Sequence, residues 1–259
     1  MRHVFTHGWN RQKRDGRDFK LALPSEVYVE TQILTKGMPP VWDQGQLGSC
    51  TAHGSLAAFE FCLFNLAVPV DPLSRLQVYY DTRVLGGSYP AEDSGGVIRD
   101  AVRVLASIGA APEAMWPYDV GQFAIKPPQG VYDAAQRMEA LEYRAVPETV
   151  AGLKGALALG LPVIIGFDVY GNFQDIGADG IMPMPDGQVE GGHCVCVVGF
   201  SDREYHDSTF GLLPAGYFLV RNSWGADWGR HGHFLMPYAA VEATAASDFW
   251  VIAAIQKGE

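Results

Sequence analysis

The sequence predicts an α+β protein, because segments with helical periodicity dominate its first half and strand-like segments its second. Apolar residues recur at helical spacing in residues 50–66, 73–85 and 96–108. Later runs are rich in Val, Ile and Phe and are bounded by Gly or Pro, as is typical of strands: residues 163–169, 192–200, 216–222 and 249–255. Helices that precede strands in this way indicate a helical lobe beside a sheet or barrel lobe.

The helix expected over residues 50–66 has a clear pattern. Its apolar positions, spaced by four, three and four residues, are Ala52, Leu56, Phe59 and Leu63. This spacing places them on one stripe of the helix surface. Ser49 precedes the first helical residue and is expected to cap the helix N-terminus.

The remaining segments are less regular. A short helix is expected over residues 153–159, because Gly160 and Pro162 follow it. Residues 1–40 are polar and irregular, and residues 109–135 contain four prolines, so both are expected to be loops.

Composition excludes several classes of function. The 259 residues carry a net charge of −10, which disfavours nucleic acid as a partner because phosphate binding needs a basic face. No apolar run approaches the roughly 20 residues that span a bilayer, so no membrane partner is expected. The N-terminal stretch, residues 1–20, lacks the apolar core of a secretory signal, and a cytoplasmic protein is the default expectation.

The four cysteines do not form a metal or disulfide pattern. No CxxC pair suggests zinc, and Cys62, Cys194 and Cys196 are expected to be buried thiols. Four aspartates lie between residues 168 and 186, but their spacing fits no EF-hand. His231 and His233 lie in a glycine-rich turn and are expected to be solvated. Neither a metal nor an organic cofactor is predicted.

Three short clusters contain the residues suited to chemistry. The first, GQLGSCTA at residues 45–52, places Cys50 at a helix start, where unpaired N–H groups favour the nucleophilic thiolate. The second, GGHCVCVVGF at residues 191–200, opens a strand with His193. The third, NSWGADWG at residues 222–229, begins with Asn222 at a strand end.

Together, in this order, the clusters resemble those of the papain family of cysteine peptidases. In that family the His and Asn follow the Cys by about 130–150 residues. The separation of His193 from Cys50 falls within this range, whereas that of Asn222 exceeds it, and an extended loop at residues 201–215 accounts for the excess. The resemblance covers residues 38–255 and implies a papain-like two-lobed fold, with an antiparallel β-barrel-like lobe and the active site in the cleft between the lobes.

The resemblance also implies a role for each residue of the catalytic site. Cys50 would attack the scissile carbonyl, and His193 would take and return the proton. Asn222 would hold the imidazole. Gln44 and the backbone N–H of Cys50 would bind the oxyanion, and Trp224 would shield the bond between His193 and Asn222.

For the substrate, the resemblance implies four glycines. The backbone of Gly95 and Gly96 would pair with an extended peptide. Gly166 and Gly192 would line a specificity pocket that is roomy and without charge, which favours a bulky apolar residue one position before the cleaved residue.

The chain departs from the family pattern around the nucleophile. Thr51 stands where the family usually has Trp, and Leu47 where it has a disulfide cysteine. The partner cysteine is replaced within residues 92–94, so this disulfide is absent, which suits a reducing compartment. These changes place the chain in a divergent, prokaryotic-type branch.

The expected function is therefore peptide-bond hydrolysis through a thioester, by an endopeptidase. Two alternatives remain open: an acyltransferase or ligase that uses the same Cys-His-Asn site, and a non-catalytic binding module on this fold. The expected organisation is an N-terminal extension at residues 1–37 and a peptidase domain at residues 38–259, with a helical lobe at about 45–135 and a β lobe at about 136–255.

The N-terminal extension carries an unusual charge. Residues 1–20 hold six Lys or Arg and two Asp, whereas the remainder has 13 basic and 27 acidic residues. Its apolar residues, expected to anchor it, are Phe5, Trp9, Phe19 and Leu21. We expect residues 1–20 to dock on the enzyme body, as a clamp on the fold in preference to a lid on the cleft.

Overall fold

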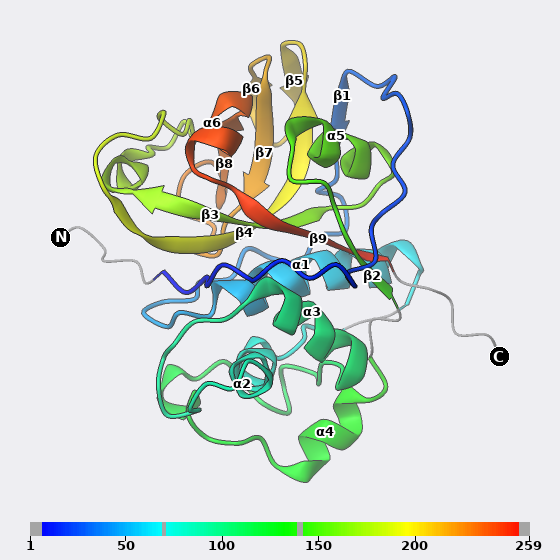
Figure 1. Ribbon diagram of the computed structural model, residues 1–259, viewed down its shortest axis with the longest axis vertical. Coiled ribbons are helices and arrows are strands. Elements are labelled where there is room, and N and C mark those ends of the chain that lie inside the picture. Colours follow the sequence, from blue (N-terminus) through cyan, green and yellow to red (C-terminus); the bar gives the residue numbers. More distant parts are fainter. Residues whose placement is uncertain (1–6, 69–70, 139–141, 254–259) are drawn as a thin grey trace.

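The chain folds into a helical lobe and a β lobe that face each other (Figure 1). The computed structural model describes residues 7–68, 71–138 and 142–253. The helical lobe contains α1 Cys50–Asn65, α2 Arg75–Leu85, α3 Ile98–Ser107, the 3-10 turn η1 Val120–Gln122 and α4 Gln129–Ala135. The predicted α+β class, with a helical lobe and an antiparallel β lobe, is confirmed.

The β lobe is built on one antiparallel sheet in the order β2-β9-β3-β4-β7-β8, with β1 also paired to β4. Its strands are β1 Thr31–Ile33, β2 Glu142–Ala145, β3 Val163–Tyr170, β4 Val189–Ser201, β7 Tyr217–Arg221, β8 His233–Pro237 and β9 Ser247–Ala253. A separate hairpin joins β5 Tyr205–Asp207 to β6 Gly211–Leu213. The remaining elements are α5 Val150–Ala158, the 3-10 turn η2 Gly171–Asp175 and α6 Tyr238–Ala243.

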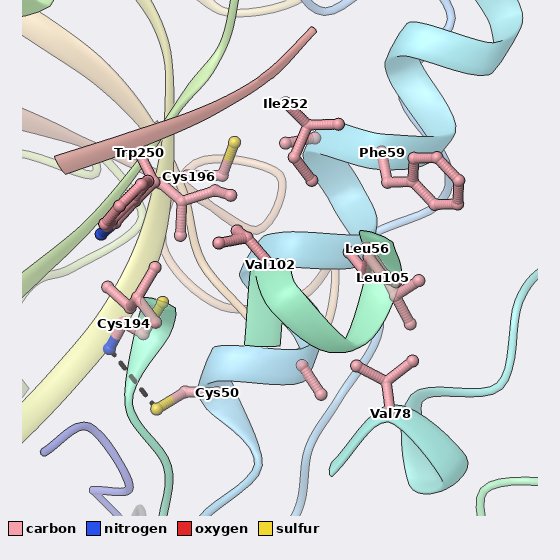
Figure 2. Close-up of a cluster of buried hydrophobic side chains, with 14 of the residues drawn as sticks. Cys50, Leu56, Phe59, Val78, Val102, Leu105, Cys194, Cys196, Trp250 and Ile252 are labelled. Carbon is pink, nitrogen blue, oxygen red and sulfur yellow. Dashed lines mark hydrogen bonds between the residues drawn. The ribbon is translucent and has the colours of Figure 1, made fainter. Parts of the chain in front are cut away.

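Strand β4 connects the two lobes through the alternation of its side chains. Cys194 and Cys196 belong to a core shared with α1, whereas Val195 and Val197 belong to the core of the β lobe. This alternation follows from the two-residue period of a strand. Figure 2 shows Cys194 and Cys196 on the side that faces α1, next to Trp250 and Ile252 of β9.

Helix α1 begins and ends close to its predicted bounds, but its surroundings differ from the prediction. The sequence predicts one apolar stripe, yet every residue from Cys50 to Phe59 is buried, because the helix lies between the two lobes. Ser49 occupies the cap position without a capping hydrogen bond. Its hydroxyl instead lies 2.6 Å from the Tyr118 hydroxyl and 3.3 Å from His53 Nδ1.

The main helices and strands are confirmed, and the structure adds elements within the segments predicted to be loops. Helix α4 lies in the proline-rich segment, and strand β1 lies in the N-terminal extension. Because β1 pairs with β4, the extension expected to end at residue 37 contributes a strand to the β lobe. The last two residues of the strand predicted at 249–255 lie outside the described residues.

None of the helices within the described ranges is both long and apolar enough to cross a bilayer.

Candidate active site

The nucleophile candidate lies at the junction of the two lobes. Cys50 is the first residue of α1 and is fully buried. The backbone N–H of Cys194 on β4 points at its Sγ, 3.4 Å away (Figure 2). The packing of α1 on β4 therefore holds the sulfur beside the strand that carries His193.

His193 and Asn222 are in direct contact. His193 Nε2 lies 2.7 Å from Asn222 Oδ1, and both residues are buried. An amide oxygen only accepts hydrogen bonds, so Nε2 carries the proton and Nδ1 of the neutral ring keeps a lone pair. Nδ1 is buried and has no hydrogen-bond partner. The imidazole is thus in the tautomer that a general base at Nδ1 requires.

An aromatic cluster covers this pair. The ring of Trp224 stacks on His193, with centroids 4.9 Å apart and planes inclined by 28°. Phe173 and Trp228 pack edge-on against Trp224 at 5.6 Å and 5.1 Å. The Trp224 ring therefore lies where the resemblance places a water shield.

Gln44 is held rigidly near the start of α1. Its Nε2 donates to the Leu47 carbonyl at 2.9 Å, and its Oε1 accepts from the Ser223 hydroxyl at 2.5 Å. Its backbone N–H also donates to the Ser223 carbonyl at 2.8 Å. Ser223, which the sequence analysis did not single out, thus fixes the orientation of the Gln44 amide.

A hydrogen-bonded carboxylate spans the place where the family disulfide is absent. Asp93 accepts the backbone N–H of Gly48 at 3.1 Å and 3.0 Å and also accepts the Tyr79 hydroxyl. This contact ties the turn before Cys50 to the loop that leads to Gly95. The sequence analysis noted only that no cysteine was present here.

The N-terminal segment, residues 7–20, crosses the site between the two lobes (Figure 1). The Trp9 N–H donates to the Gly192 carbonyl at 2.9 Å, and the Gly96 N–H donates to the Gly8 carbonyl at 2.7 Å. The Asn10 N–H donates back to the Gly96 carbonyl at 2.9 Å. The glycine backbone expected to bind an extended peptide therefore binds residues 8–10 of the same chain.

The Trp9 side chain fills the space between the two pocket glycines. A Cβ at Gly166 would lie 2.0 Å from Trp9 Cε2, and one at Gly192 would lie 2.6 Å from Trp9 Cε3. At the far end, the indole N–H donates to Asp248 Oδ2 at 3.0 Å. The expectation that this pocket lacks charge was wrong, because Asp248 is distant from both glycines in the sequence and was not considered.

Further contacts fasten the segment beyond the pocket. Asp248 Oδ2 also accepts the Gln12 N–H at 2.8 Å, Arg11 pairs with Asp168 at 3.3 Å, and Arg99 pairs with Asp18 at 2.5 Å. Trp9 is a buried anchor, as the sequence analysis expected. Phe19 is not, because 70% of its surface is exposed, and Phe5 lies outside the described residues.

Burial under this segment reverses the electrostatics expected of the site. Burial raises the pKa of Cys50 to about 11, although backbone N–H groups of Cys194, Gly8 and Thr51 act in the opposite direction. Burial lowers the pKa of His193 to about 3, against the hydrogen bond with Asn222. In this closed form the pair is therefore a thiol and a neutral imidazole, and Cys50 is not the thiolate that the helix start was expected to favour.

The sequence analysis also made predictions for three other thiols and two other histidines. Cys62, Cys194 and Cys196 are buried, as predicted. His231 is exposed, but His233 is buried, contrary to the expectation of two solvated rings, because β8 begins at His233. Within the described ranges, no three His, Cys, Asp or Glu side chains group as a metal site would require.

Known proteins with the same arrangement were found by sequence and by structure. A model of the papain family cysteine proteases matches residues 24–249. An uncharacterized peptidase C1-like protein of Acanthamoeba polyphaga mimivirus is 38% identical, over 81% of this chain and 68% of that protein. Cathepsin B-like CP2 of Giardia intestinalis is 27% identical, over 77% of this chain and 64% of that protein.

Solved structures agree with these matches. The crystal structure of xylellain, a cysteine protease from Xylella fastidiosa, has a TM-score of 0.83 and 34% identity over 96% of both chains. Digestive procathepsin L 3 of Tenebrio molitor has the same fold, with a TM-score of 0.70 at 18% identity, over 92% of this chain and 75% of that one. The extent of the family match and the identity to these relatives show that this chain belongs to the papain family and is a hydrolase of the cysteine peptidase type.

Proposed function

We propose that the protein is a latent endopeptidase that cleaves peptide bonds through a thioester on Cys50 and is covered by its own residues 7–12. One observation carries the proposal: an extended stretch of this chain lies over Cys50 and beside the bonded pair of His193 and Asn222. A cleft that binds an extended peptide backbone on both sides suits internal segments of protein substrates.

In the acylation step, Cys50 Sγ attacks the substrate carbonyl carbon while His193 Nδ1 accepts the thiol proton. The carbonyl oxygen becomes an oxyanion, which the Gln44 side-chain amide and the Cys50 N–H stabilise. The C–N bond then breaks, His193 returns the proton to the leaving amine, and a thioester remains on Cys50.

In the deacylation step, His193 removes a proton from water, which attacks the thioester carbonyl. The C–S bond breaks, the acid product leaves, and the thiol is restored. Asn222 Oδ1 accepts from Nε2–H throughout, so the imidazole stays oriented in both steps. Trp224, stacked on His193, would keep water from competing for this hydrogen bond.

The segment is placed so that it resists cleavage. Its Gly8 N–H lies near enough to the Cys50 sulfur to lower the thiol pKa, and its Gly8 carbonyl accepts a hydrogen bond from the Gly96 N–H. The bridge between Trp9 and Gly96 is parallel. Cys50 therefore faces an N–H group, whereas attack requires a carbonyl carbon, and this favours the lid over the clamp expected from the sequence.

Cys50 provides the direct test of catalysis. In a Trp9→Ala background, which uncovers the site, we expect cleavage of a denatured protein at internal bonds and complete loss of cleavage on adding Cys50→Ala. Mass spectrometry of the products and of acid-quenched enzyme should show an acyl adduct on the peptide that contains Cys50.

The same assay separates the alternatives for the reaction. Removal of residues only from chain ends would contradict an endopeptidase, and cleavage that survives Cys50→Ala would contradict the nucleophile. If an added amine captured the acyl group in preference to water, the enzyme would be an acyltransferase.

Trp9 is expected to hold the lid closed. Truncation of a buried Trp typically costs about 3–5 kcal/mol, so Trp9→Ala should shift the lid toward the open form and raise the peptidase rate at least about tenfold. Phe19→Ala is the matched control, since Phe19 lies in the same segment and is largely exposed. A lower melting temperature with an unchanged rate per folded molecule would show that the segment is only a clamp.

Acid is expected to open the lid. Burial holds the pKa of His7 below its usual 6.5, against the charge of Glu190. His193 takes its proton from Cys50 when the charged pair forms, so it adds no proton from solvent. Below pH 6.5 the open form therefore binds up to one more proton through His7, and closure weakens as the pH falls, by up to about tenfold per pH unit. Asp248 acts in the opposite direction, because burial raises its pKa to about 6, so the series is measured on chains that carry Asp248→Asn. In that background, the rate of the chain that keeps Trp9, divided by that of Trp9→Ala, should rise toward one between about pH 7 and 5. A constant ratio would refute this coupling.

Asp248 is expected to set substrate choice once the lid opens. Its carboxylate would then end an otherwise apolar pocket and accept from a long side chain that carries N–H groups, as it does from Trp9. In the Trp9→Ala background, peptides with Arg one position before the cleaved residue should lose at least about tenfold in kcat/KM on Asp248→Ala, since hydrogen bonds between charged groups are strong. The kcat/KM of peptides with Leu at that position should change little on Asp248→Ala. As a control, Asp168→Ala should leave the kcat/KM of both the Arg and the Leu peptides nearly unchanged. If Asp248→Ala left the ratio of kcat/KM for the Arg and Leu peptides unchanged, Asp248 would not set this preference.

A further inference from the structure

A second pocket lies on the β lobe, and its lining includes neither a residue of the lid nor Cys50, His193 or Asn222. Its volume is about 510 Å³, within the range of small-molecule sites. One wall is formed by the segment after β1, from Ile33 to Val41, and the other by the hairpin from Tyr205 to Phe210. Arg221, at the end of β7, and His233, at the start of β8, complete the lining.

Arg221 is a buried cation that forms no ion pair within the described part of the chain. Only 5% of its surface is exposed, and its guanidinium donates to the Pro40 carbonyl. Glu60 lies near enough to affect its charge, and burial lowers the pKa of Arg221 to about 10. A buried charge without a paired anion is costly for the fold, and an anion bound from outside the chain would reduce that cost.

His233, directly opposite Arg221 in the β7–β8 register, carries a second unused polar atom. Its Nδ1 lies 2.8 Å from the His231 carbonyl, which only accepts, so Nδ1 carries the proton. The Nε2 atom is therefore a hydrogen-bond acceptor. It is buried and lacks a partner, and the ring is held in place by the edge-to-face contact with Phe210 at 4.9 Å.

From these features we propose that this pocket binds a small organic anion that carries a hydroxyl or N–H group. Arg221 would pair with the anionic group, and His233 Nε2 would accept the donor. Lys36 adds a second positive charge at the wall. Asp207, the acidic residue of the lining, already accepts the Thr209 and Phe210 N–H groups through Oδ1, at 2.7 Å and 2.9 Å. Phe210 and Tyr205 supply an aromatic surface for the body of the ligand.

Three matched probes test the chemistry: 4-hydroxybenzoate, benzoate without the hydroxyl, and phenol without the carboxylate. Titration of the full chain, followed by ligand-observed NMR and calorimetry, should show one saturable site with affinity in the order 4-hydroxybenzoate, benzoate, phenol. Added NaCl should weaken binding of the two acids and leave phenol unaffected.

Variants locate the site. Arg221→Met should weaken binding of 4-hydroxybenzoate at least about tenfold, and Lys36→Met should weaken it by a smaller factor because Lys36 is exposed. His233→Phe should remove the advantage of 4-hydroxybenzoate over benzoate. Lys126→Met, in the helical lobe, is the matched control and should bind normally. If Arg221→Met fails to fold, the expected effects of Lys36→Met and His233→Phe on binding test the proposal without it.

Two results would overturn the proposal. One is the absence of saturable binding by 4-hydroxybenzoate up to about 10 mM, where any remaining affinity is negligible. The other is binding that is equal in the Lys36, His233 and Lys126 variants, which would place the probe elsewhere.

Discussion

The packing of helix α1 on strand β4 is the contact on which the rest of the site depends. It brings the first residue of a helix against a strand from the other lobe, so that the Cys194 N–H meets the Cys50 sulfur. The next residue back along β4 is His193, and the neighbouring strand β7 leads into Asn222. Strand β4 thus contacts Cys50 through Cys194 and Asn222 through His193, because one strand has one face toward each lobe. Small side chains such as Gly54, whose added Cβ would lie 3.2 Å from Cys194 Sγ, permit this close approach.

Because Cys50 is packed so closely between α1 and β4, the protonation of Cys50 and His193 depends on whether solvent reaches them. A helix N-terminus favours thiolate by about 1 kcal/mol or less at an exposed position, whereas complete burial favours the neutral thiol by more, and here burial dominates. The lid therefore does more than block substrate. While residues 7–9 are in place, the sulfur and the imidazole are both held in their uncharged forms, and opening of the proposed lid would admit solvent and allow the charged pair to form.

The sequence alone predicted the elements and residues whose signals are local. The helix at Cys50, the strand that begins near His193 and the turn at Asn222 each have a distinctive short pattern. It did not predict contacts that depend on distant partners. Trp9 meets Asp248 from the opposite end of the chain, and Asp93 replaces a disulfide by accepting the Gly48 N–H. Strand β1 was missed because so short a strand shows no period, and β8 because His233 was interpreted as part of an exposed turn.

The glycines at positions 96, 166 and 192 explain how one surface could bind both the proposed lid and a substrate. A side chain at Gly166 or Gly192 would exclude the Trp9 indole, so the pocket accepts a large ring only because both positions lack a Cβ. The backbone of Gly96 binds the segment through one N–H and one carbonyl. These bonds do not depend on which side chains the bound peptide carries. What differs between lid and substrate is therefore the group presented to Cys50. The proposed lid would present the Gly8 N–H, which lowers the pKa of the Cys50 thiol, and not a carbonyl carbon that the sulfur could attack. The proposed latency would follow from the placement of one peptide unit and would require no change in the residues proposed to be catalytic.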